Sequence, residues 1–129
     1  MTGANGVQPH GLNSIEAGDA ALAGGLFVLH PLPVRSIVDV EKLADDRLPL
    51  FDTYRSDSHG GTGEKFDWTL LDGIERDFVL AGGLGPDNVA EAIARIAPWG
   101  VDASSGLESA PGVKDPDLIR RFVTEAKKR

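Results

Sequence analysis

With 129 residues, 41% of them hydrophobic and 26% charged, the chain is long enough for one domain with a hydrophobic core and has the composition of a soluble globular protein. Its 13 Lys and Arg residues against 20 Asp and Glu residues give a formal net charge of −7, which argues against nonspecific binding to a nucleic-acid backbone. The absence of cysteine excludes disulfides, thiolate metal sites and a cysteine nucleophile among these residues.

Neither a membrane span nor a secretory signal is expected. No apolar run approaches the roughly 20 residues that a transmembrane helix needs. The opening residues MTGANGVQPHG have neither a basic region nor an apolar core. We therefore expect a cytoplasmic protein without a membrane partner, whose residues 1–6 form a loose N-terminus.

The first part of the chain alternates short apolar runs with helical patterns. A strand is expected over residues 6–11, and a helix around residues 14–22 with Ser14 as its N-cap. The apolar run 26–29 is typical of a buried parallel strand. The two prolines that follow this run exclude a helix there, and residues 38–44 again have helical periodicity.

The middle of the chain repeats this alternation. Residues 48–51 and 78–81 are predicted to be buried strands. Between them lie a polar, glycine-rich loop over residues 54–65 and a short helical turn that Asp67 can cap.

Two further helices are predicted towards the C-terminus. The first begins at Pro86-Asp87-Asn88 and ends at Pro98, and a short strand over residues 101–103 follows it. Asp115 and Pro116 have the N-cap and first-position preferences of the second helix. The apolar stripe of this last helix comprises Leu118, Ile119, Phe122, Val123 and Ala126.

Strand and helix thus alternate about five times, which predicts an α/β fold with a parallel sheet in a single domain over residues 1–129. A doubly wound open sheet and a (β/α) barrel share this pattern, and the periodicity alone leaves both open. In either fold the chemistry is expected at the C-terminal ends of the strands.

Two carboxylates stand at such strand ends. Asp52 directly follows Phe51 and lies near Tyr54, and partial burial there would raise its pKa towards a value useful for general acid or base catalysis. A solvated or capping aspartate is the alternative, and the position alone favours it. Asp102 is expected to face a site rather than the core, because burying an unpaired carboxylate is costly.

Two turns rich in glycine or serine are candidate phosphate cradles. Gly82 and Gly83 precede the predicted helix start, so free backbone N–H groups and the helix dipole would act together on an anion. Ser104, Ser105 and Gly106 form a second donor-rich turn after the next strand. A plain tight turn between strand and helix is the alternative for the first of them. Because the loops after the last two strands of barrels often share one phosphate, the two turns together favour phosphate binding.

Other polar residues point to no further site. Residues 60–63 are either a mobile lid over a ligand or an ordinary connector. His10, His30 and His59 lack the spacing that is typical of metal ligands, so no metal site is expected.

Taken together, the runs LFDTY, GGTGEKFDW, FVLAGGLGPDNVAEAI and GVDASSGLESAPGVKDPDLIRRF resemble the C-terminal half of the phosphoribosylanthranilate isomerases, which are (β/α)8 barrel enzymes of tryptophan biosynthesis. The match is dense over residues 48–129, and residues 7–11 resemble the family's VQLHG strand. This resemblance implies a partial TIM barrel of about the last five βα units, about three fewer than a whole barrel has. Its open sheet edges would favour self-association.

The resemblance also implies an Amadori rearrangement that needs no cofactor and no metal. Asp52 would be the general acid that opens the ribose ring, a base would remove the proton from C2′, and the enolamine would tautomerise to the ketone. The phosphate of a small phosphoribosyl substrate would be held by Gly61, Gly82, Gly83, Ser104, Ser105 and Gly106, and the rest of the pocket would be lined by Gln8, His10 and Asp102.

The chain departs from the family pattern at the general base. In the family this base is a cysteine in a KxCG motif on the first strand, and the chain contains no cysteine. Activity of this chain alone is therefore in question. A catalytically inactive phosphosugar-binding half-barrel, or a fragment, is the alternative hypothesis.

Overall fold

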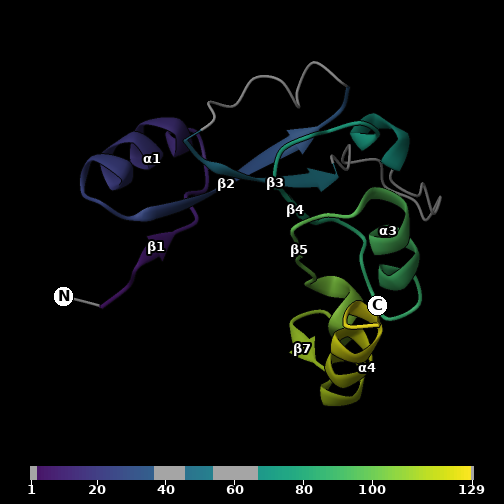
Figure 1. Cartoon of the computed structure of the whole chain (residues 1–129). Coiled ribbons are helices and arrows are strands. Elements are labelled where there is room, and N and C mark those ends of the chain that lie inside the picture. The colour runs from purple at the N-terminus through teal and green to yellow at the C-terminus, as the bar shows by residue number, and fades with distance from the viewer. Residues whose placement is uncertain (1–2, 37–45, 54–66, 129) are drawn as a thin grey trace.

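The computed structural model describes residues 3–36, 46–53 and 67–128 (Figure 1). A sheet of five strands forms its centre, and every neighbouring pair of these strands is parallel. The parallel α/β fold predicted from the sequence is therefore confirmed. The strands are β1 Gly6–Val7, β2 Phe27–Val34, β3 Leu48–Thr53, β4 Val79–Leu80 and β5 Gly100–Val101.

Each strand of this sheet lies beside the strand that precedes it in the chain. The order is β1-β2-β3-β4-β5, with no reversal among the described strands. A doubly wound sheet reverses its strand order at a switch point, whereas a (β/α) barrel keeps its strands in consecutive order. The strand order thus decides the alternative that the periodicity left open, in favour of barrel winding.

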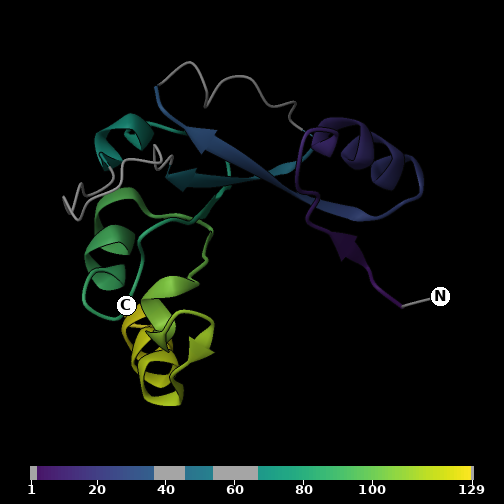
Figure 2. The ribbon, with the colours of Figure 1, turned by 180° about the vertical axis from the view of Figure 1, so that it is seen from behind.

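Helices lie beside the first strands and beside the last strands of the sheet. α1 (Ser14–Ala23) contacts β1 and β2, whereas α3 (Val89–Ile96) and α4 (Pro116–Ala126) pack against each other near β4 and β5, as both views show (Figures 1 and 2). No helix in the described parts of the chain is long and apolar enough to cross a membrane. The helical elements are α1 Ser14–Ala23, η1 Trp68–Leu71, α3 Val89–Ile96, η2 Ser105–Leu107 and α4 Pro116–Ala126, and a hairpin of β6 Glu108–Ala110 and β7 Val113–Lys114 precedes α4.

Two hydrophobic clusters lie on the two faces of the sheet, because successive residues of a strand point to opposite faces. The larger cluster includes Phe51 and Leu80, both fully buried, and extends to residues of η1, α3 and α4. Within it the rings of Phe51 and Phe78 lie 5.3 Å apart. The smaller cluster is formed by Leu50, Val79 and Ala81, with Leu29 and Leu48 packed against it. The helix-covered face is therefore the main core.

Side-chain caps confirm two of the predicted helix starts, and the predicted cap of a third helix is corrected. Asp115 accepts hydrogen bonds from the backbone N–H groups of Asp117 and Leu118 at 2.8 and 3.3 Å, with Pro116 at the first helical position. The carboxylate of Asp67 accepts from Thr69 N at 3.0 Å. The prediction that Ser14 caps α1 is wrong. The N-cap is Asn13, because its carbonyl already accepts the Ala17 N–H at 2.9 Å and Ser14 lies inside the helix.

Strand β2 is longer than the predicted run 26–29, and it contains Pro31 and Pro33. β1 pairs only with Phe27 and Val28, so among the described residues the later part of β2 has β3 as its sole neighbour. An open side is where a strand tolerates prolines, since no ladder hydrogen bond is lost there. The remaining strands β4 and β5 are shorter than predicted, and Asp102 follows β5 directly.

The apolar stripe of α4 is only partly buried. Leu118, Phe122 and Ala126 pack into the main core. Ile119 and Val123, which were expected in the same stripe, are 37% and 43% exposed. They lie one residue further around the helix, about 100° away, and so point past the contact with the neighbouring elements. The helical pattern 38–44 and the loop 54–65 fall outside the described residues.

Candidate functional site

The C-terminal ends of the parallel strands gather most of the candidate residues at one edge of the sheet. Gln8 directly follows β1, Asp52 is the penultimate residue of β3, and Asp102 follows β5. In the register of the sheet, Ala81 N donates to Phe51 O and Asp102 N donates to Leu80 O, both at 2.8 Å. The ends of β3, β4 and β5 are thus level with one another.

The alternation of side chains places Asp52 on the inner face of the sheet, which is the face opposite the main core and carries the smaller cluster. Leu48 and Leu50 belong to the smaller cluster, and Asp52 continues their period of two along β3. Phe51 points the other way, into the main core. Asp52 is exposed, and Tyr54 lies outside the described residues.

The turn after β4 has a backbone that favours glycine. Gly82 and Gly83 have φ angles of +88° and +66°, a region that side chains rarely adopt. No hydrogen bond within the described parts of the chain uses their N–H groups. The side chain of Asn88 holds this turn, since its Oδ1 accepts from Gly85 N at 2.9 Å and its Nδ2 donates to Gly83 O at 3.0 Å. The two glycine N–H groups therefore remain available to a ligand.

The turn after β5 presents a second set of donors. η2 follows Ser104, whose carbonyl accepts the Leu107 N–H at 3.0 Å. The N–H groups of Ser105 and Gly106 make no hydrogen bond within the described residues, and both residues are exposed. Two neighbouring turns thus carry unused backbone donors.

These two turns are in direct backbone contact at Gly106. A Cβ built on Gly106 would lie 2.1 Å from Leu84 O and 3.2 Å from Gly85 Cα, far inside any normal contact. Only a residue without a side chain lets the turns approach this closely. The structure therefore places Gly82, Gly83, Ser105 and Gly106 in adjoining turns.

Sequence reasoning missed two side chains that hold these turns. Asn88 was taken only as part of the helix start, although it fastens the Gly82–Gly85 turn. Lys114 was not considered at all, yet its Nζ donates to Ser104 O at 2.9 Å and to Glu108 Oε1 at 2.6 Å. Opposite charges on either side of the Pro111-Gly112 turn were the one available signal. The hydrogen bond from Lys114 to Glu108 is the largest cause that holds the pKa of Glu108 below its usual value. A hydrogen bond from Gly112 N is the second cause.

Two further candidates are not part of these two turns. His10 lies beyond β1 and is exposed. Gly61, expected at the phosphate, falls outside the described residues. Among the residues that the structure describes, no three His, Cys, Asp or Glu side chains gather closely enough to hold a metal ion.

His30 belongs to a separate buried cluster on the helix-covered face. It is 1% exposed, and its Nδ1 has no hydrogen-bond partner among the described residues. Arg47, which forms an ion pair with Asp19, lies close to it against Gly18 of α1. Burial, and then the charge of Arg47, lowers the pKa of His30, while Asp19 acts in the opposite direction. This imidazole is part of the packing of α1, not of the site.

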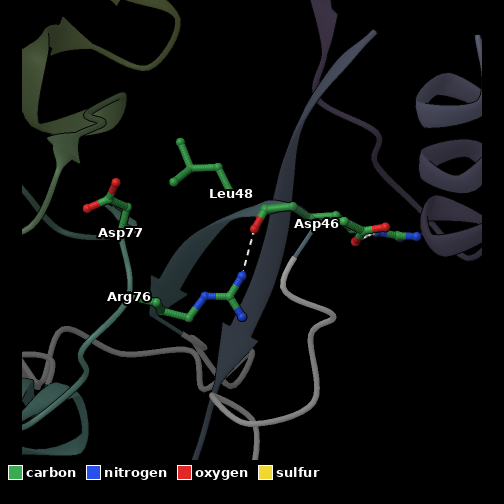
Figure 3. A pocket seen from close by; sticks show the side chains of 5 residues that line it. Asp46, Leu48, Arg76 and Asp77 are labelled. Carbon is green, nitrogen blue, oxygen red and sulfur yellow. Dashed lines mark hydrogen bonds and ion pairs between the residues drawn. The ribbon is translucent and has the colours of Figure 1, made fainter. Parts of the chain in front are cut away.

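A shallow pocket lies at the opposite end of β3 from Asp52. It is lined by Asp46, Arg47, Leu48, Arg76 and Asp77 (Figure 3). Two of these residues are joined by a hydrogen bond, in which Arg76 Nη2 donates to Arg47 O at 2.7 Å. In a barrel the N-terminal end of the strands serves stability, whereas ligands bind at the C-terminal end. The pocket is therefore not the candidate site.

A family profile, related sequences and solved structures all match this chain, and all three kinds of match are to the same family. The sequence profile of the family described as N-(5'-phosphoribosyl)anthranilate isomerase matches residues 4–125. The isomerase of that name from Rubrobacter xylanophilus is 42% identical over 132 aligned positions, which cover 98% of this chain and 64% of that protein. The one from Citrifermentans bemidjiense is 50% identical over 106 positions, which cover 78% of this chain and 51% of that protein.

Solved structures of the same enzyme show the same fold. The crystal structure of phosphoribosyl anthranilate isomerase from Thermotoga maritima has a TM-score of 0.79 and 38% identity, and the match covers 95% of this chain and 62% of that one. Another crystal structure, of phosphoribosyl anthranilate isomerase in complex with reduced 1-(o-carboxyphenylamino)-1-deoxyribulose 5-phosphate, has a TM-score of 0.73 and 36% identity, and the match covers 95% of this chain and 59% of that one. This chain thus spans between half and two thirds of the length of these relatives.

Proposed function

The chain belongs to the N-(5'-phosphoribosyl)anthranilate isomerase family, and we propose that it takes part in the Amadori rearrangement of N-(5'-phosphoribosyl)anthranilate to the carboxyphenylamino-deoxyribulose phosphate in tryptophan biosynthesis. The observation that carries the proposal is the C-terminal edge of the sheet. There a carboxylate on the inner face of β3 stands at the same edge as two adjoining turns with unused backbone donors.

Phosphate binding is the part of the function that the geometry supports best. The N–H groups of Gly82, Gly83, Ser105 and Gly106, with the Ser104 hydroxyl, would donate to the phosphate oxygens, and Gly61 would approach from the loop over residues 54–65. Backbone N–H groups bind a phosphate dianion without any net positive charge on the protein, which suits a chain of net charge −7. The ligand of the related crystal structure is itself a 5-phosphate.

Asp52 is the proposed general acid. Its proton would pass to the ribose ring oxygen as the C1′–O bond breaks, which leaves a Schiff-base cation. Removal of the C2′ proton then gives the enolamine, and tautomerisation of the enolamine gives the ketone. One proton enters at oxygen and one leaves at carbon, so the reaction needs no redox partner. Gln8, His10 and Asp102 are proposed to line the sugar and anthranilate part of the pocket.

The base that removes the C2′ proton is proposed to lie outside these 129 residues. The family resemblance implies a cysteine in this role, and the sequence has no cysteine. The chain would then contribute the acid and the phosphate site, and a polypeptide that carries the KxCG strand would complete the reaction. If another residue of the chain replaced the cysteine, His10 would be the first candidate, since it follows β1 at the same edge.

Backbone amide NMR tests the proposed site directly. Titration with reduced 1-(o-carboxyphenylamino)-1-deoxyribulose 5-phosphate should shift the amide signals of Gly82, Gly83, Ser105 and Gly106 in a saturable manner. The same compound without its phosphate should shift them much less. Shifts confined to residues 46–48 and 76–77, at the other end of β3, would contradict the proposal.

A further inference from the structure

Lys114 connects the turn after β5 to the hairpin that follows it. Its ammonium group donates to Ser104 O at 2.9 Å, to Ser104 Oγ at 3.2 Å and to Glu108 Oε1 at 2.6 Å. An ammonium has three protons, and these three bonds use all of them. The Lys114 side chain is 46% exposed and that of Glu108 is 16% exposed, so the ammonium group lies at the surface and its carboxylate partner is mostly covered.

The bond to Ser104 Oγ determines what that hydroxyl can still do. A hydroxyl has one proton to donate and two lone pairs to accept with. Because Lys114 occupies a lone pair, the proton of Ser104 stays available, and it is directed away from the ammonium by charge repulsion. The bond to Ser104 O meanwhile fixes the peptide group from which the Ser105 N–H projects.

We propose that Lys114 is a positioning residue for phosphate binding: it orients the Ser104 hydroxyl and the Ser105 amide towards the anion, and adds positive charge behind them. This inference rests on the proposed function. It concerns Lys114, to which the sequence analysis assigned no role.

Glu108 has the opposite electrostatic effect on the same site. Its carboxylate holds Lys114 in place. The negative charge of this carboxylate also reduces the electrostatic attraction between the ammonium group and a bound anion. Gly112 N also donates to Glu108 Oε2 at 3.1 Å, so the carboxylate is fastened from the hairpin side as well. A neutral glutamine at this position keeps an acceptor for Lys114 and removes the negative charge. The two partners of one ion pair are therefore expected to affect phosphate affinity in opposite directions.

Calorimetric titration of the whole chain with ribose 5-phosphate separates these effects. We expect Lys114→Met to weaken binding about tenfold or more, since charge-assisted hydrogen bonds at the turn are lost. Lys114→Arg should recover part of the affinity. Glu108→Gln should bind as tightly as the unchanged chain or more tightly. The matched control is Lys128→Met, which removes the same charge from an ion pair with Glu125 in α4 and should change the affinity less than twofold.

The outcomes distinguish the inference from the function on which it rests. If the unchanged chain binds ribose 5-phosphate and Lys114→Met binds as tightly as Lys128→Met, the role of Lys114 is overturned and the phosphate site stands. If Glu108→Gln weakens binding as much as Lys114→Met, the pair merely holds the hairpin together, and the inference again fails. Absence of binding by the unchanged chain would overturn both. Should Lys114→Met not fold, Lys114→Gln gives the same comparison.

Discussion

At the level of single residues, the site contains groups that would touch a ligand and groups that only hold them. Gly82, Gly83 and Ser105 present backbone donors, whereas Asn88 and Lys114 fasten the turns that carry these donors. A glycine turn without such hydrogen bonds would sample many conformations, and ordering it on binding would cost free energy. The hydrogen bonds of Asn88 and Lys114 hold the donors in a fixed geometry before any ligand binds.

His30 makes stability depend on pH although it lies outside the site. It is buried on the helix-covered face, and among the described residues the charged groups that face it are Arg47 and Asp19. Its pKa in the folded chain is lowered from 6.5, so between these two values the unfolded chain binds the proton more readily. The stabilisation is complete above pH 6.5 and is lost as the pH falls below it.

Urea unfolding at pH 7.5, 6.5 and 5.5 measures this dependence. The free energy of unfolding should fall with decreasing pH in the unchanged chain and fall less steeply in His30→Leu. His10→Gln, which changes an exposed imidazole, is the control and should follow the unchanged chain. Parallel curves for His30→Leu and the unchanged chain would show that this imidazole is not the titrating group.

At the level of elements, the contact between the two turns depends on Gly106. Its missing side chain lets the loop after β5 lie against Leu84 and Gly85 of the loop after β4. Gly106→Ala should destabilise the fold by about 1–3 kcal/mol, the usual cost of an overpacked contact, because a Cβ would lie 2.1 Å from the Leu84 carbonyl oxygen.

The matched control for this prediction is Gly24→Ala. An added Cβ at Gly24 would come no closer than 3.4 Å to any atom, and its φ is −81°. Chemical denaturation should therefore show little loss for Gly24→Ala and a clear loss for Gly106→Ala. Equal midpoints for the two variants would mean that the turns separate without cost, and that the proposed phosphate site is not rigid.

Elements with a local signal were predictable from the sequence, and those that depend on distant partners were not. Asp115 followed by Pro116 marks its helix start by short-range hydrogen bonding alone, and the structure has the cap as predicted. The choice of Asn13 over Ser14 depends on where the first turn closes, and both residue types suit the position. The hairpin and the contact of Lys114 with Ser104 could not be predicted in this way, because they depend on which turn lies next to the hairpin.

At the level of the whole molecule, the sheet has open edges and exposed apolar side chains. Among the described residues, β1 and β5 each pair on one side only. Phe27 on β2 is 53% exposed and has the same orientation as the inner face. Unpaired edges and exposed apolar surface favour contact with another polypeptide. The strand order that creates these edges could not be read from periodicity, which fits open sheets and barrels alike.

Self-association is therefore predicted for the isolated chain. Sedimentation at increasing concentration should show a mass rising above 13.6 kDa. Phe27→Glu should reduce the association, because it puts a charge on the exposed apolar face, whereas Val113→Glu, at a 54% exposed position on β7, should not. A concentration-independent mass of one chain would contradict this prediction.

The isomerase reaction itself is the most direct test of the account, because it requires the acid and the phosphate site to act together. Conversion of N-(5'-phosphoribosyl)anthranilate would be followed by loss of its fluorescence, with and without a polypeptide that carries the first three βα units of a relative. We predict turnover only in the mixture, lost in Asp52→Asn and retained in Asp117→Asn, which changes an exposed aspartate of α4. Turnover that persists in Asp52→Asn would contradict the central claim.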